Sequence, residues 1–222
     1  MNIIYYQYFE YMSLLVAIIC YRGLKKFSIA LFIALIFLGC LADTLGENYS
    51  GWGLNRLTNH NEDYLIYNPY LILSTPILLH LFGKMLRLTK KEKKVFLWIS
   101  LLVMALILLN YFFGEGVFNF NTNSLVLIAL VTIFLSVFVL LRLAMEEERV
   151  ITFFKEPFFW ISSGFLLFGL GELILGLQTY IEMNNIKLFG KSIYTLVMDI
   201  LNVFLYSAFS LAFILCQKYI RT

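Results

Sequence analysis

Two apolar stretches decide the fold of this chain: residues 165–179, FLLFGLGELILGLQT, and residues 195–210, TLVMDILNVFLYSAFS. Each is hydrophobic enough to lie in lipid, yet each contains one acid, Glu172 in the first and Asp199 in the second. An ionisable side chain inside a membrane span is costly, so it faces protein or water and marks a functional site by default. The two stretches therefore predict two membrane helices that share a buried polar site.

Both stretches carry a stripe of polar and small residues at helical spacing. In the later stretch the residues step by four and three, which places them on one helix face: Thr195, Asp199, Asn202, Tyr206 and Ser210. The earlier stretch has a matching stripe of Ser162, Phe165, Gly169, Glu172, Gly176 and Thr179. Because both stripes contain an acid, we expect them to face the same polar site.

The composition of the whole chain is that of a membrane protein. Of its 222 residues, 61% are hydrophobic, and the mean hydropathy is +0.82. Soluble domains contain about 45–50% apolar residues, and about 20 apolar residues cross a bilayer as a helix. The sequence therefore predicts an all-α membrane protein, one domain over residues 1–222, with seven transmembrane helices at about 3–21, 27–46, 64–86, 95–113, 123–143, 157–181 and 192–217.

Basic residues are unevenly divided between the two sides that seven spans create. One side has only Arg56, Lys187 and Lys191, whereas the other has fourteen: Arg22, Lys25, Lys26, Lys84, Arg87, Lys90, Lys91, Lys93, Lys94, Arg142, Arg149, Lys155, Lys218 and Arg221. Positive charge favours the cytoplasmic side. We therefore predict an outside N-terminus, a cytoplasmic C-terminus and a multi-pass protein of the cell membrane, specifically a bacterial inner membrane.

Spans 2 and 6 resemble each other, since each sets an acid between glycines. The pairs are Gly39–Gly46 around Asp43 and Gly169–Gly176 around Glu172. Spans 1–3 and 5–7 are compatible with related triplets joined by span 4, a 3+1+3 arrangement that is parallel because both triplets start outside. The alternative is that the glycines serve only close helix packing.

The polar residues of the spans gather in the predicted outer half of the bundle. They are Glu10, Asp43, Asn68, Tyr70, Glu172, Asp199, Asn202 and Tyr206. We expect an outward-facing pocket lined by spans 1, 2, 3, 6 and 7, whose acids hold protons or bind a cation or an amine. The alternatives are that Asp43 caps its span, that Glu10 lies near headgroups, and that Asp199 and Asn202 bond neighbouring helices. His80, in the inner half of span 3, is either a helix–helix hydrogen-bond donor or a proton relay.

Several reaction chemistries lack their residues. A retinal Schiff base needs a lysine within the last span, where the sequence has none, and seven-helix zinc hydrolases need more intramembrane histidines than His80. Phosphate-loop, dinucleotide and nucleophile-elbow motifs are absent. Cys20, Cys40 and Cys216 fall inside apolar spans and suit buried packing. We therefore expect no enzyme activity, no cofactor and no metal site.

The run KEPFFWISSGFLLFGLGE, residues 155–172, and the run DILNVFLYSAFSLAF, residues 199–213, carry a resemblance. They resemble a group of small, uncharacterised seven-helix membrane proteins of Bacteroidota. The matching positions are Pro157, Phe159, Trp160, Ile161, Ser162, Gly164, Asn202 and Tyr206. The chain departs from that group at Ser74, where related chains often have an acid. The resemblance implies the layout and, by analogy of architecture, an accessory or sensory role, but it brings no activity.

Three functions agree with these features. The first is a sensory or regulatory module whose pocket binds a small polar ligand or cation, and whose cytoplasmic segments 84–94 and 144–157 contact a protein partner. The second is a small-solute or proton-coupled transporter with Glu172 or Asp199 as its carrier carboxylate. The third is a structural subunit of a membrane complex. The basic segment 84–94 is expected to lie against anionic membrane lipids rather than nucleic acid.

Overall fold

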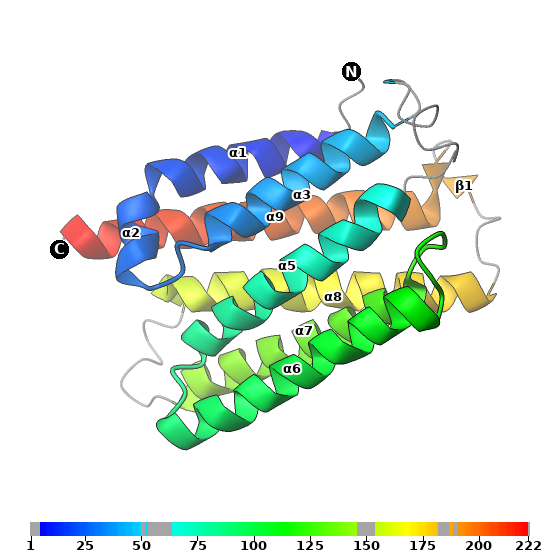
Figure 1. Ribbon diagram of the computed structural model, residues 1–222. Coiled ribbons are helices and arrows are strands. Elements are labelled where there is room, and N and C mark those ends of the chain that lie inside the picture. The colour runs from blue at the N-terminus through cyan, green and yellow to red at the C-terminus, as the bar shows by residue number, and fades with distance from the viewer. Residues whose placement is uncertain are drawn as a thin grey trace.

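The computed structural model describes residues 5–49, 52, 64–145, 154–181, 187–188 and 191–221, which are almost entirely helical (Figure 1). The elements are α1 (Tyr5–Ile19), α2 (Tyr21–Lys26), α3 (Phe32–Glu47), α5 (Tyr64–Met85), α6 (Lys90–Phe113), α7 (Thr122–Met145), α8 (Pro157–Ile181), β1 (Lys187–Leu188), β2 (Lys191–Ser192) and α9 (Ile193–Arg221). The two short strands pair antiparallel just before α9. The all-helical prediction is confirmed, apart from this small ladder.

Five of these helices, α5 to α9, are long and apolar enough to cross a membrane. The protein is thus a multi-pass helical membrane protein. Helices α1 and α3 have 15 and 16 residues, a rise of about 22–24 Å against a hydrocarbon core of about 30 Å. Seven crossings, the 3+1+3 repeat and the orientation therefore stay predictions.

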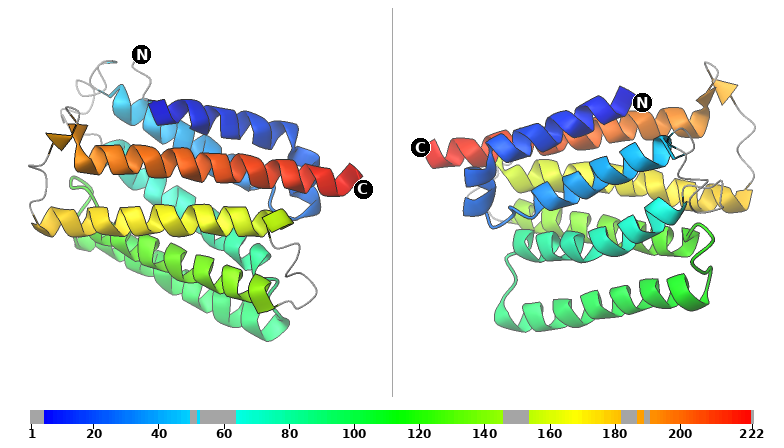
Figure 2. Two further views of the ribbon diagram at one scale, coloured as in Figure 1. Left: turned by 180° about the vertical axis from the view of Figure 1, so that it is seen from behind. Right: turned by 45° about the horizontal axis from the view of Figure 1, so that its top comes forward.

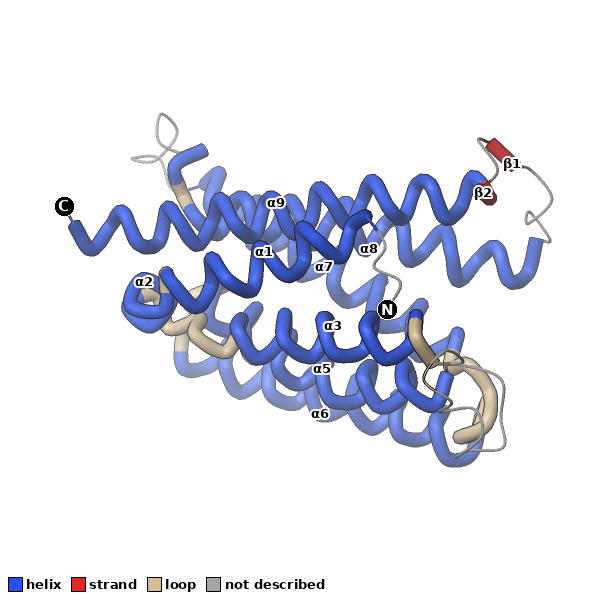
Figure 3. Tube along the Cα trace, turned by 90° about the horizontal axis from the view of Figure 1, so that it is seen from above, coloured by secondary structure: helices blue, strands red, loops and turns tan. Residues whose placement is uncertain are grey.

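Six helices form a closed ring, and the seventh long helix lies outside it. Each helix contacts the next in the order α7, α8, α9, α1, α3 and α5, and α5 contacts α7, which closes the ring. Helix α6 packs mainly against α5 and α7, and it lies at the edge of the bundle in two different views (Figures 2 and 3). We call the end of the bundle that carries α2, the α5–α6 connection and the C-terminus the basic end (Figure 1).

Glycines allow the ring helices to approach closely. A Cβ added at Gly171 would lie 2.3 Å from the Leu201 side chain of α9, and one at Gly164 would lie 3.3 Å from Leu205. Gly169 faces the other way, toward Ile133 of α7. Small residues at such contacts let membrane helices pack closely, because lipid provides no hydrophobic drive between them. Gly164 and Gly171 therefore serve packing on one face of α8, and Gly169 serves it on another.

Helix α1 turns its polar residues inward and its apolar residues outward. Gln7, Glu10 and Ser13 are almost fully buried, whereas Met12 and Leu15 are more than half exposed. A soluble helix shows the reverse pattern, with its apolar stripe toward the core. An exposed apolar face suits lipid, so this helix has the surface of a membrane-embedded segment.

Aromatic side chains fill the interior of the six-helix bundle between its centre and the basic end. Phe32, Phe165 and Phe209 are buried, and the Phe209 ring lies 4.9 Å from each of the other two. Phe82 and Phe213 extend the cluster, with centroids 5.4 Å from Phe165 and Phe32 respectively. We call these five residues the aromatic floor. They close the interior of the bundle between its centre and the basic end.

Candidate functional site

A small cavity lies at the centre of the six-helix ring. Its volume is about 90 Å³. Five helices line it, mostly with apolar side chains, and its polar groups come from Tyr70, Ser74, Thr132, Glu172 and Tyr206. Phe165 and Phe209 of the aromatic floor also line it. The cavity is therefore a mostly apolar pocket with a few polar groups in its wall.

Helix register explains why three of these side chains meet. Glu172 lies fifteen residues after the start of α8, Tyr206 fifteen residues before the end of α9, and Tyr70 fifteen residues before the end of α5. All three helix ends lie toward the basic end, and fifteen residues give a rise of about 22 Å along each helix. The ends are not level, since α9 extends past the start of α8 (Figure 1), but all three side chains line the same cavity.

Glu10 of α1 lies directly behind this cavity. Its side chain has no exposed surface, and the Tyr206 hydroxyl donates a 2.7 Å hydrogen bond to its Oε1. Its Oε2 has no hydrogen-bond partner of good geometry among the described residues, although the Cys40 thiol lies beside the carboxyl. A Cβ added at Gly39 would lie 2.8 Å from Oε1, so a larger residue there would require the carboxyl to shift. Glu10 is thus a fully buried acid with one strong hydrogen bond, from Tyr206, and a weak thiol donor beside it.

Glu172 lines the cavity from the side of α8. It is partly buried, and it lies near enough to the Tyr70 hydroxyl to interact with it electrostatically. None of the described residues that line the cavity is basic. The cavity therefore brings together one carboxyl at its wall and a second behind Tyr206, with no positive side chain between them.

Two other predicted site residues have partners of their own outside the cavity. Asp43 is partly buried and accepts a hydrogen bond from the Tyr6 hydroxyl, while its charge acts on Glu10. The Asn68 side chain donates to the Asn119 carbonyl at 2.8 Å and accepts from the Asn121 amide at 3.1 Å. Asn68 therefore holds the α6–α7 connection against α5, and Asp43 belongs to the surroundings of Glu10.

The acid of α9 that the sequence paired with Glu172 is not among the cavity-lining residues. Asp199 and Asn202 lie on the same face of α9 as Tyr206 and are partly buried. They are seven and four residues nearer the start of the helix, which is about 10 Å and 6 Å along its axis. The distance along α9 therefore separates them from the cavity that Tyr206 reaches.

His80 is exposed and faces a different cavity, between α5 and α6. It lies two to three turns from the Glu172 level, so the predicted proton relay has no described path to the cavity. Of the two predicted partner segments, 84–94 is described and 144–157 falls largely outside the described residues. Within the described residues, no group of three or more His, Cys, Asp or Glu side chains is arranged to hold a metal ion.

Sequence reasoning missed the contribution of α7. Thr132 of that helix lines the cavity, and Ser136, one turn away, is fully buried. Both residues interrupt a stretch that is otherwise Leu, Ile, Val and Phe, and this polar spacing was an available signal. Ser74, left in doubt because of the resemblance, also lines the cavity. Neither Thr132 nor Ser74 could show from the sequence that α7 lies beside α5 and α8.

Comparisons with known proteins add no second source of information. No protein-family model matches the chain, and no curated protein and no solved structure matches it either. The function is therefore argued from the residues of the site and their surroundings.

Proposed function

We propose that this protein is a non-enzymatic sensory or regulatory membrane module that binds a small cation at the cavity between Glu172 and Glu10. A partner protein at the basic end then reads the state of the bundle. The observation that carries the proposal is Glu10, a fully buried carboxyl with one oxygen unpaired among the described residues, next to a cavity lined by a second acid.

The charge of the site favours a cation over an anion or a neutral solute. One carboxyl lies in the cavity wall and a second behind Tyr206, and the described lining residues include no basic group to neutralise them. Carboxylates in an apolar interior need a counter-charge or a proton. The hydroxyls of Tyr70 and Tyr206 supply further oxygen atoms for a hard cation or an ammonium group.

The size of the cavity limits what it can hold. Its volume of about 90 Å³ equals about three water molecules at their share of liquid volume. Drug-sized ligands occupy about 300–1,000 Å³. A monovalent metal ion, an ammonium ion or a protonated water cluster fits, whereas a sugar or a nucleotide does not.

The aromatic floor favours sensing over transport. Five buried phenylalanines lie between the cavity and the basic end, so most of the interior in that direction is apolar, although the buried Ser136 and Ser162 also lie on that side. A transporter must open both sides in turn. The second candidate, a proton-coupled transporter, is favoured by the hydrogen bond between Tyr206 and Glu10, because a proton shared by these groups is exchangeable.

The test measures cation binding to the full chain in nanodiscs. Melting temperatures are compared in sodium, potassium, lithium and methylammonium chloride against choline chloride, whose cation is too large for the cavity. We expect one small cation to stabilise the fold, by about 2.7 kcal/mol at 100 times its Kd. Glu172→Gln and Glu10→Gln should abolish this effect, and Asp199→Asn, the matched control, should keep it.

The other outcomes separate the candidate functions. Equal melting temperatures in all five salts, or a cation effect that survives both glutamine variants, contradict the proposal. Cation flux into liposomes that depends on Glu172 would assign the chain to the transporters instead. A stable partner recovered by purification in native lipid supports the signalling role, and a solitary protein counts against it.

A further inference from the structure

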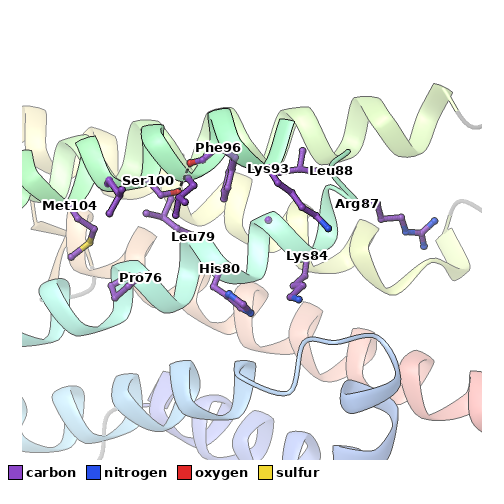
Figure 4. Close-up of a pocket in the computed structure, with 13 residues that line it drawn as sticks. Pro76, Leu79, His80, Lys84, Arg87, Leu88, Lys93, Phe96, Ser100 and Met104 are labelled. Atoms are coloured by element: carbon purple, nitrogen blue, oxygen red, sulfur yellow. Dashed lines mark hydrogen bonds between the residues drawn. The ribbon is translucent and has the colours of Figure 1, made fainter. Parts of the chain in front are cut away.

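A second, much larger cavity lies between α5 and α6, outside the ring. Its volume is about 590 Å³. It runs along the outer helix from Lys93 to Met104, a rise of about 16 Å. Figure 4 shows Lys93 extending from α6 toward α5, with Lys84 and Arg87 near the same end. We call this cavity the α5–α6 groove.

One end of the groove is positively charged. Lys84, Arg87 and Lys93 line it, and all three are exposed. Among the described residues neither lysine has an ion-pair partner, because the nearby acid Glu92 is bound by Arg142 at 3.2 Å. The Arg87 guanidinium lies over the Phe158 ring, 5.8 Å from its centroid, so the charges of Lys84 and Lys93 are the ones that face an anion in the groove.

The remainder of the groove is apolar. Pro76 and Leu79 line it from α5, and Leu97, Leu101 and Met104 line it from α6. The outer helix is mostly exposed, and in the described protein only Val103 and Ile107 of its residues are buried. The apolar part of the groove therefore opens along a surface that faces lipid, where an acyl chain replaces missing protein contacts.

We propose that the α5–α6 groove binds one anionic phospholipid, with its phosphate at Lys84 and Lys93 and an acyl chain along Leu97, Leu101 and Met104. A charged end joined to an apolar channel is the shape of an amphiphile. Basic pockets between membrane helices bind anionic headgroups in this way. The occupant is a membrane lipid rather than a free phosphate, because free phosphate leaves the apolar channel unused.

The cavity on the other side of α6 provides an internal comparison. It lies between α6 and α7 and has a volume of about 550 Å³, but its charged residues are Lys91 and Glu92, of opposite sign. A neutral lipid chain suits it as well as an anionic one. Preference for anionic headgroups should therefore belong to the α5–α6 groove.

The experiment is native mass spectrometry of the full chain, titrated with phosphatidylglycerol or with phosphatidylcholine of the same acyl chains. We expect tighter binding of phosphatidylglycerol by the native protein. Lys84→Gln with Lys93→Gln should reduce that preference about 25-fold, since each lysine near an anionic lipid contributes about fivefold. The matched control is Lys90→Gln with Lys94→Gln, which removes the same charge from exposed residues outside the groove.

A second variant tests the apolar part. Ser100→Phe places an aromatic ring in the apolar channel. It should weaken the binding of phosphatidylglycerol and leave the binding of glycerol 3-phosphate, which has no acyl chain, unchanged. The proposal is overturned if the two double variants lose the same preference, because charge at the membrane surface then explains it. It is also overturned if glycerol 3-phosphate displaces the lipid at equal concentration, or if Ser100→Phe binds as the native protein does. Melting curves show whether each variant is folded.

Discussion

Helices α8 and α6 have similar lengths and similarly apolar residues, yet they pack in opposite ways. Helix α8 has glycines toward both neighbours, and a Cβ added at Gly171 would collide with Leu201. Helix α6 has no glycine between Lys90 and Phe113, and large cavities lie on both of its sides. In lipid, residue size at the contact decides how closely two helices approach.

Helix α6 is not closely packed along its length. Polar contacts at both of its ends attach it to the bundle instead. At the basic end, Thr89 and Glu92 form a capping box, and Arg142 of α7 donates to Glu92 and to the Leu86 carbonyl. At the other end, the Asn110 amide reaches Ser124 at 2.9 Å. Close packing therefore holds the ring helices together, whereas hydrogen bonds attach the outer helix. Different substitutions should destabilise the two kinds of contact.

The largest effect should follow from adding a methyl group where the ring meets α2. A Cβ at Gly23 would lie 2.7 Å from the backbone of Cys216 and Gln217, which cannot rotate away. We expect Gly23→Ala to destabilise the protein by about 3 kcal/mol, measured by unfolding in mixed micelles. At the loose contact, Gly83→Ala meets only the edge of the Phe96 ring at 3.0 Å. Equal losses in the two variants would contradict the difference in packing.

A smaller effect should follow from removing the hydroxyl that faces Glu10. Tyr206→Phe keeps the ring but leaves the fully buried carboxyl without its 2.7 Å hydrogen bond. We expect a loss of about 2 kcal/mol, since a buried charged group left unpaired costs about 1–3 kcal/mol or more. The control is Tyr11→Phe, which loses a 2.6 Å bond to Thr44 in a partly buried place and should cost about 1 kcal/mol or less. A reversed order would show that Glu10 does not depend on Tyr206.

The smallest effect should concern the outer helix alone. Asn110→Ala removes contacts to Ser124, Asn121 and Glu115, and we expect a loss of about 1 kcal/mol. Hydrogen exchange should then quicken in the last turns of α6 and stay unchanged in α8. Leu102→Ala, at a residue 59% exposed to lipid, should change stability by less than about 0.5 kcal/mol. Faster exchange throughout the ring would show that α6 is not a separate unit.

Much of the fold was predictable from the sequence. Hydropathy placed all the long helices, and the bounds predicted for α8, residues 157 and 181, agree with the structure. The acids at and behind the cavity were visible in the sequence because a carboxyl in an apolar run is rare and costly. Polar residues at helical spacing also identified Tyr206 and Glu172 as members of inward-facing stripes.

The partners of those acids were not predictable in the same way. Periodicity gives the face of a residue but not its level on a neighbouring helix, so Asp199 was paired with Glu172 although it lies about 10 Å along α9 from the Tyr206 level. The sequence also predicted that Asn68 lines the pocket, whereas in the structure it bonds residues 119 and 121. Nothing in the sequence shows that these two residues fold back onto Asn68.

The sequence by itself therefore determined a helical, multi-pass membrane protein with a few buried acids, because both properties depend on the cost of placing polar groups in lipid. Only the tertiary structure decided that Tyr206 and Glu172 line one cavity with Glu10 behind it, and that α6 lies outside the ring. Those facts depend on helix neighbours and relative heights, which side-chain size and contacts across the whole chain settle together.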